Sequence, residues 1–210
     1  MKRKHHLTKK DFPGIDFDNS EGQEMYDRHV ATCKHLIKSK KSKKDISVPL
    51  NPTKQAIIDR IYQEFKGIRL TSGIGILEGE GMDDYLSPDA LRFLRNKDRE
   101  LYATWEDIPS EALDACYCAL SFTDAIGMRF MFPAFLVHDL KEGLSVGPAV
   151  FYMMCAVSDP KLHDYTLNKF TLFSPAQIDV LRDYYTYYRE KNGADDPYIQ
   201  DSVPFYDLMK

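Results

Sequence analysis

The chain has few of the residues from which catalytic and metal-binding sites are usually built. It contains six histidines, of which only His138 and His163 lie beyond position 50, and four cysteines. Two histidines exclude a three-histidine metal site in that part of the chain and leave little room for a Ser/His/Asp or Cys/His arrangement. Cys116 and Cys118 lie too close together, within a predicted helix, to bridge each other easily, so all the cysteines are expected to be free thiols.

Long apolar segments are missing as well. No run approaches the roughly 20 apolar residues of a membrane-spanning helix. The N-terminus, MKRKHHLTKKDF, lacks the apolar stretch of a secretory signal. These absences predict a cytoplasmic protein that does not enter the membrane. With 43% hydrophobic residues, the chain can bury one sizeable core.

The charge is divided unevenly along the chain. Residues 1–50 hold 12 Lys and Arg against 7 Asp and Glu, whereas the whole chain holds 28 against 32. The balance is therefore +5 for residues 1–50 and −9 for residues 51–210. An acidic body disfavours nucleic-acid binding by the core and favours a basic protein as partner. Solubility alone is the commoner reason for a charge of this size.

Three segments are predicted: a basic leader (1–50), a helical core domain (51–192) and a C-terminal tail (193–210). In the leader, a capping-box pattern precedes one amphipathic helix, and the run KSKKSKKD indicates a solvated linker. The fold class predicted for the core is mainly α, a single compact multi-helix domain.

Proline at the first helical position after a capping residue predicts three helix starts, at Asn51-Pro52, Ser87-Pro88 and Ser174-Pro175. Apolar spacing predicts further helices after Pro109, at 134–140 and at 149–157.

Two segments are expected not to be helical. Glycines interrupt Ile68–Pro88, which is expected to be loop-rich with one short strand at most, and Ser121–Phe132 is expected to be a turn around Asp124 and Gly127.

Four patterns occur in order along the core. They are LEGxGxDDY at 77–85, WxDIP at 105–109, LSFxDxxGxRFxxPAF at 120–135 and SPAQ at 174–177. Together they resemble an uncharacterised bacterial domain family of small cytosolic proteins, over about residues 54–189. The resemblance implies no activity and no catalytic residue, and the leader lies outside it.

Four carboxylates, those of Glu78, Glu80, Asp83 and Asp84, fall within seven positions of the glycine-rich segment. Mg²⁺ and Ca²⁺ take oxygen ligands from such loops, so one hypothesis is a metal-assisted hydrolase or transferase. The alternative, which we favour, is that an aspartate caps a turn or pairs with Arg129 while the glutamates face water. No metal ligand and no cofactor are assigned.

Arg129 lies in an apolar stretch, where an unpaired guanidinium is costly. Its candidate partners are Asp83, Asp84 and Asp124, and an internal ion pair is favoured over an anionic ligand. Tyrosines surround more than one face of the last predicted helix, so some hydroxyls are expected to reach solvent, with Tyr184 and Tyr187 as binding candidates. Packing of these rings against the core is an equally open alternative.

The hypothesis for function is binding of another, basic protein through an acidic surface, as in an immunity-like or inhibitor protein that has no catalytic residues. A domain tethered through the leader is a further alternative. A thiol dyad of His138 with Cys116 or Cys155 is conceivable, but a structural histidine is favoured.

Overall fold

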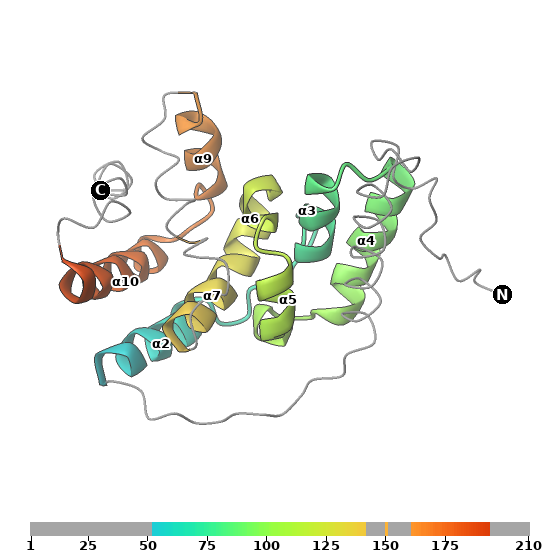
Figure 1. Ribbon diagram of the computed structural model, residues 1–210. Helices are drawn as coiled ribbons and strands as arrows, with labels where there is room; N and C mark the ends of the chain where they lie inside the picture. Colours follow the sequence, from blue (N-terminus) through green and yellow to red (C-terminus); the bar gives the residue numbers. More distant parts are fainter. Residues whose placement is uncertain (1–51, 142–149, 151–160, 194–210) are drawn as a thin grey trace, which may run out of the picture.

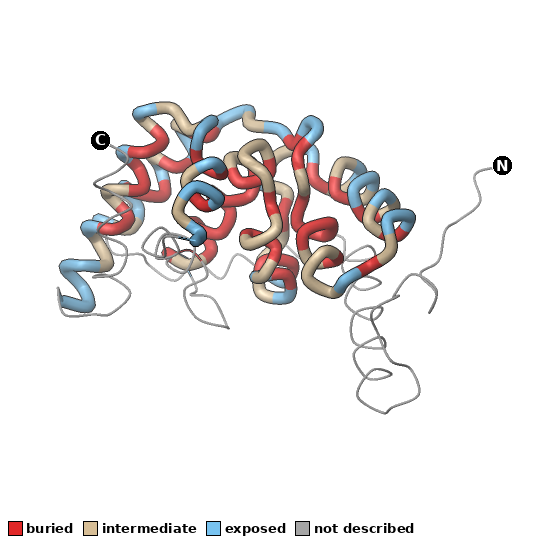
Figure 2. Tube along the Cα trace, turned by 90° about the horizontal axis from the view of Figure 1, so that it is seen from above, coloured by how far each residue is buried: buried red, intermediate tan, exposed pale blue. Residues whose placement is uncertain are grey.

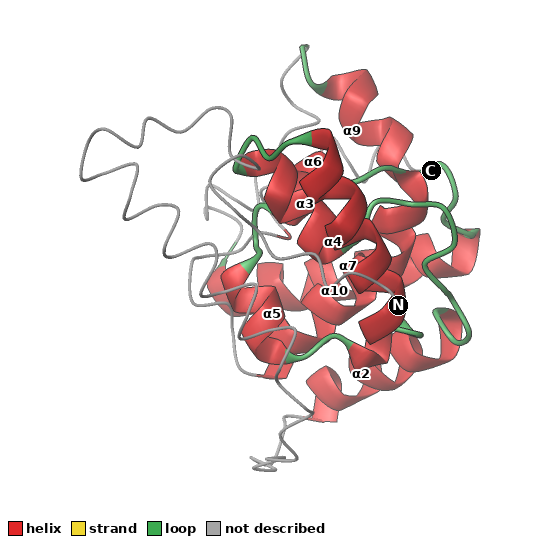
Figure 3. Cartoon of the chain, turned by 90° about the vertical axis from the view of Figure 1, so that its right-hand side faces the viewer, coloured by secondary structure: helices red, strands yellow, loops and turns green. Residues whose placement is uncertain are grey.

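A computed structural model describes residues 52–141, 150 and 161–193, and the regular elements in these ranges are all helical, as Figure 3 shows. The predicted mainly α fold is confirmed, and these ranges contain no strand. The elements are α2 (Pro52–Glu64), α3 (Ile76–Asp83), α4 (Pro88–Leu101), the 3-10 helix η2 (Trp105–Asp107), α5 (Ser110–Ala115), α6 (Ala119–Phe122), α7 (Ala125–Lys141), α9 (His163–Lys169) and α10 (Pro175–Asn192).

Helix α7 lies at the centre of the fold (Figure 1). It packs against α2, α5, α6, α9 and η2, while α10 packs beside α2 and α3 is held between α4 and α6. Most residues of α7 are buried all round the helix, as expected of a helix that is apolar on every side. Figure 2 shows buried residues running through the middle of the molecule and exposed ones facing outwards.

The three helix starts with proline are confirmed. α2 begins at Pro52, α4 follows Ser87, and α10 follows Ser174. Ser174 Oγ accepts a hydrogen bond from Gln177 N at 3.2 Å, and Ser174 N donates to Gln177 Oε1 at 3.0 Å, which completes the expected capping box.

The prediction of a loop-rich segment at Ile68–Pro88 is wrong for Ile76–Asp83, which form α3, whereas residues 68–75 and 84–87 are not helical. Glycine lets this helix approach its neighbour closely: a Cβ on Gly79 would lie 3.0 Å from the carbonyl oxygen of Ala119 in α6. Burial between α4 and α6 therefore outweighs the low helix propensity of the glycines.

The predicted turn at Ser121–Phe132 is also wrong for most of its length, because α7 begins at Ala125 and contains Pro133 in its interior. Asp124 Oδ1 accepts from Gly127 N at 2.8 Å and so caps the first turn of α7. The helix predicted after Pro109 is broken into α5 and α6, and the structure adds α9 and η2, which were not predicted.

Several predictions fall outside the described residues: the leader helix, its lysine-rich linker, most of the helix at 149–157 and the C-terminal tail. Val150, from that helix, is helical and buried. Among the described helices, none combines the length and apolar character that crossing a membrane requires.

Trp105, in η2, links the end of α2 to the segment that precedes α5. Its side chain is 1% exposed, and its indole Nε1 donates to the carbonyl oxygen of Phe65 at 3.0 Å. The ring of Tyr62 lies 5.0 Å from the indole, centroid to centroid. This contact fixes the end of α2 against the turn that precedes α5.

Candidate functional site

The four carboxylates of α3 separate into an inner one and an outer group. Glu78 is 1% exposed, and both of its carboxylate oxygens accept from Arg95 Nε of α4 at 3.0 Å. Glu80, Asp83 and Asp84 are half-buried and lie towards the C-terminal end of the helix. Glu78 therefore serves an internal ion pair, and only the other three contribute to the surface.

The outer carboxylates meet the turn between α5 and α6. The side chain of Cys118 forms hydrogen bonds with Asp83 and with Tyr117, and the charges of Asp83 and Glu80 act on both Cys118 and Tyr117. Burial, helped by these negative charges, raises the pKa of the Cys118 thiol to about 11. Because the thiolate is the reactive form, Cys118 is a poor nucleophile at neutral pH.

Tyr85 follows these carboxylates in a conformation that glycine normally adopts. The end of α3 is a Schellman motif, in which Leu86 N donates to the Gly81 carbonyl at 3.0 Å and Tyr85 N donates to the Met82 carbonyl at 3.2 Å. Tyr85 has φ of 54° and is the one non-glycine residue with positive φ in the described ranges. Its side chain is 75% exposed, so core packing does not offset the strain.

We call the set Glu80, Asp83, Asp84, Tyr85 and Tyr117 the acidic–tyrosine surface. The last turn of α3 contains no basic residue, and the partial negative charge of a helix C-terminus adds to the carboxylates there. Carboxylates at this end are unfavourable for the helix itself. The helix dipole therefore does not account for the acidic residues, and core packing does not account for the strained tyrosine.

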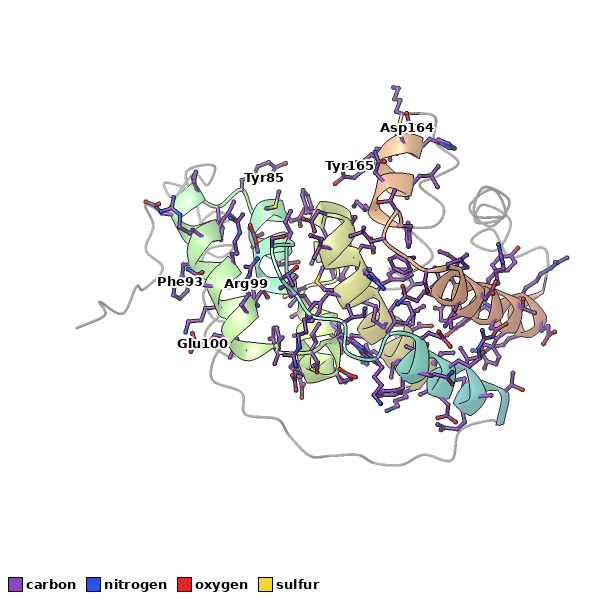
Figure 4. All side chains as sticks on the ribbon, turned by 180° about the vertical axis from the view of Figure 1, so that it is seen from behind. Tyr85, Phe93, Arg99, Glu100, Asp164 and Tyr165 are labelled. Atoms are coloured by element: carbon purple, nitrogen blue, oxygen red, sulfur yellow. The ribbon has the colours of Figure 1, made fainter. Side chains whose placement is uncertain are left out.

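α9 extends the same edge of the molecule. Figure 4 shows Tyr85, Asp164 and Tyr165 along its upper edge. Tyr165 is 51% exposed, and its hydroxyl donates to the carbonyl oxygen of Ser121 in α6 at 2.6 Å.

Lys169 fastens α9 to α6 beneath this edge. Its ammonium nitrogen donates to the carbonyl oxygens of Leu120 and Ser121 at 2.8 and 2.7 Å, and lies 4.4 Å from the ring centroid of Tyr165. Burial lowers the pKa of Lys169 to about 8. Sequence reasoning missed this residue, because nothing in a single lysine at the end of an unpredicted helix signals that it is buried.

The tyrosines of α10 lie elsewhere, because Figure 1 shows α7 between α10 and α3. Arg129 Nε donates to Gln177 Oε1 at 3.1 Å, so the prediction of a carboxylate partner is wrong among the described residues. The apolar stretch is helical here, and the helix directs Arg129 towards the start of α10.

The placement of Tyr184 at the surface is also wrong, because this residue is buried and its hydroxyl donates to Asp139 Oδ2 at 2.7 Å. Tyr187 is half-buried, with its ring edge-on to that of Tyr188 and beneath Lys54 Nζ at 5.8 Å. Tyr184 therefore follows the alternative prediction, in which the tyrosine rings pack against the core.

His138 is 5% exposed, and its Nε2 lies 2.8 Å from Asp114 Oδ1. In the ranges that the structure describes, no three His, Cys, Asp or Glu side chains gather where they could hold a metal ion. Glu78 binds Arg95, so it does not act together with Glu80, Asp83 and Asp84, with which the sequence pattern grouped it. Cys155 lies outside the described residues.

Replacing Tyr85 by glycine should raise the free energy of unfolding by about 1 kcal/mol, because glycine adopts positive φ without strain. Replacing it by alanine removes the ring but keeps the strain, so Tyr85→Ala should show no such gain. Urea unfolding of the three proteins measures the difference. Equal stability of Tyr85→Gly and Tyr85→Ala would contradict the assignment of strain to this position.

The fold and site together define a mainly helical domain with a carboxylate-rich, tyrosine-bearing edge. The chain belongs to a family of unknown function (DUF6714), which it matches over residues 53–200. The resemblance to an uncharacterised family is thereby confirmed. No curated protein and no solved structure matches the chain.

Proposed function

We propose that this protein binds a basic protein through the acidic–tyrosine surface. The observation that carries the proposal is Tyr85, an aromatic side chain held 75% exposed in a strained backbone conformation next to three carboxylates. Tyrosine offers rigid apolar contact area with a polar tip, which suits the centre of a protein interface. The carboxylates would attract a positively charged partner and orient its approach.

The overall charge supports the same proposal. Residues 51–210 carry a balance of −9, so the surface belongs to an acidic body. Long-range attraction between such a body and a basic partner accelerates association at low ionic strength.

An immunity-like or inhibitor protein is the form of binding that we favour. Such a protein acts by covering the working surface of its partner, for which shape and charge suffice. The reactive groups found here agree with this role, since the raised pKa of Cys118 keeps its thiol protonated and His138 is held by Asp114.

The test begins with capture of a stoichiometric partner by the full chain from its source cell. Affinity is then measured by calorimetry for the native chain, for the double variant Asp83→Asn/Asp84→Asn and for Tyr85→Ala. We expect each variant to weaken binding about tenfold or more, because an interface anchor contributes about 1–2 kcal/mol or more. The double variant should also reduce the dependence of affinity on salt.

A matched control comes from α4. Asp89 is an aspartate whose side chain is 75% exposed, and it pairs with Arg92 on its own helix. Asp89→Asn removes one negative charge outside the acidic–tyrosine surface, where the double variant removes two inside it, and should leave affinity within about twofold. Failure to capture any stoichiometric partner, or full affinity in both surface variants, would overturn the proposal.

A further inference from the structure

Asp98 is a buried carboxylate that holds the beginning of α3. It is 0% exposed, and its two oxygens accept separate hydrogen bonds, Oδ1 from Leu77 N at 2.9 Å and Oδ2 from Glu78 N at 3.0 Å. The capping position of α3 is Gly75, which has no side chain to perform this task. A residue twenty positions further along the chain therefore supplies the N-terminal cap of α3.

The charged groups around Asp98 leave its own charge without a direct ionic partner among the described residues. Glu78 faces it from α3, and the Arg95 guanidinium is bound to Glu78. Arg99 of α4 donates instead to the carbonyl oxygens of Thr71, Gly73 and Arg95.

The remaining elements around α3 also supply no ionic partner for Asp98 among the described residues. Asp124, at the start of α7, adds negative charge near Arg95. α6, whose sequence is ALSF, brings no titratable side chain to its packing with α3. Burial, followed by the charge of Glu78, outweighs the two backbone hydrogen bonds and the positive charge of Arg99, and raises the pKa of Asp98 to about 7.

We propose that Asp98 is a protonation switch that sets how the first turn of α3 is held against α4, and with it the position of the acidic–tyrosine surface at the other end of the same helix. α3 has eight residues, so the switch and the surface are two turns apart on one rigid element.

The two protonation states hold the helix differently. The ionised carboxylate accepts from both amides, but it remains a desolvated charge beside Glu78. The neutral acid removes that charge, but the oxygen that carries the proton no longer accepts a hydrogen bond in the same way. Near neutral pH the two arrangements are close in free energy, which is the condition for a switch.

The effect on stability follows from the direction of the shift. The pKa of Asp98 is higher in the folded than in the unfolded chain, so its stabilising contribution is complete below about pH 4 and is lost as the pH rises through about 7. Lowering the pH from about 8 to about 5 should therefore reduce the unfolding equilibrium constant through this group by roughly a hundredfold.

Two measurements on the full chain test the proposal. In a pH titration followed by NMR of ¹³C-labelled aspartate, one carboxyl carbon should titrate with a midpoint near 7. The ring resonances of Tyr85 should shift with the same midpoint. Titration of every aspartate below about pH 5, or Tyr85 resonances that ignore the Asp98 transition, would overturn the switch.

Variants provide the controls. Asp98→Asn removes the titrating group and should abolish both the Tyr85 transition and the corresponding part of the pH dependence of unfolding. Asp89→Asn, at an exposed position of the same helix, should preserve both. If Asp98→Asn does not fold, the titration of the native chain still decides the question.

The inference rests on the proposed function only for its biological consequence, which is partner affinity that changes near neutral pH. The two can fail separately. Coupled titration of Asp98 and Tyr85 without any protein partner would retain the switch and remove the binding role, whereas tight binding with no such titration would do the reverse.

Discussion

Replacing Gly127 by alanine should destabilise the domain by about 3 kcal/mol or more, because the added methyl group has no room. Its Cβ would lie 2.0 Å from the Ile74 carbonyl oxygen and 2.0 Å from Thr123 Oγ1. These two atoms are hydrogen-bonded to each other at 3.0 Å, and Asp124 Oδ1 accepts from Ile74 N beside them. The backbone on both sides is thus fixed, and the clash cannot be relieved by a side-chain rotation.

The matched control is Gly67→Ala. A Cβ at Gly67 meets nothing within 4 Å, and the only obstacle is its φ of +74°. This variant should lose about 1 kcal/mol. Chemical denaturation compares the two, and a loss at Gly127 no larger than that at Gly67 would show that the loop before α3 yields easily.

Replacing Gln177 by leucine should destabilise the domain by about 3 kcal/mol, since several buried polar groups would lose their partner. Gln177 is 1% exposed, and its Nε2 donates to the carbonyl oxygen of Glu64 at 2.8 Å. Its Oε1 accepts from Ser174 N and from Arg129 Nε. One side chain therefore connects α2, α7 and the start of α10, and thermal unfolding of Gln177→Leu should reveal its loss.

Gln177→Glu serves as the control, because a carboxylate retains the acceptor for Ser174 N and Arg129 and loses only the donor to Glu64. Its cost should be about 1 kcal/mol, or less if the pairing with Arg129 strengthens. A Gln177→Leu protein as stable as the native chain would exclude the proposed connecting role.

Local signals were sufficient for the helices that begin with proline at their first position. α2, α4 and α10 start where the sequence predicts, because the fixed φ of proline acts within one turn. In α4 and α10 a capping serine acts over the same distance. Their long-range packing does not need to be known for this.

The other elements depend on contacts between segments far apart in the sequence. α3 is stable despite its glycines because they allow close packing, and because a carboxylate from α4 caps it. α7 runs through Pro133 because burial on all sides outweighs one missing backbone hydrogen bond. Single-sequence patterns contain neither piece of information, so the helical residues of both segments were not predicted.

The candidate site was predictable in composition but not in arrangement. The sequence showed the acidic cluster and suggested tyrosines as binding residues. It did not show that Glu78 points inwards or that Tyr184 is buried. Nothing in the sequence marks Tyr85 as the residue at the C′ position of α3, because glycine, and sometimes asparagine, usually occupies that position.

Trp105 gives the domain an intrinsic optical reporter. It is the only tryptophan in the chain and is 1% exposed, so the native protein should emit from a single shielded indole. Because that indole is hydrogen-bonded to the Phe65 carbonyl and lies at a tilt against the ring of Tyr62, separation of α2 from η2 would expose it to water and shift its emission to longer wavelength. Opening at this junction can therefore be followed in the native sequence, without attaching a dye.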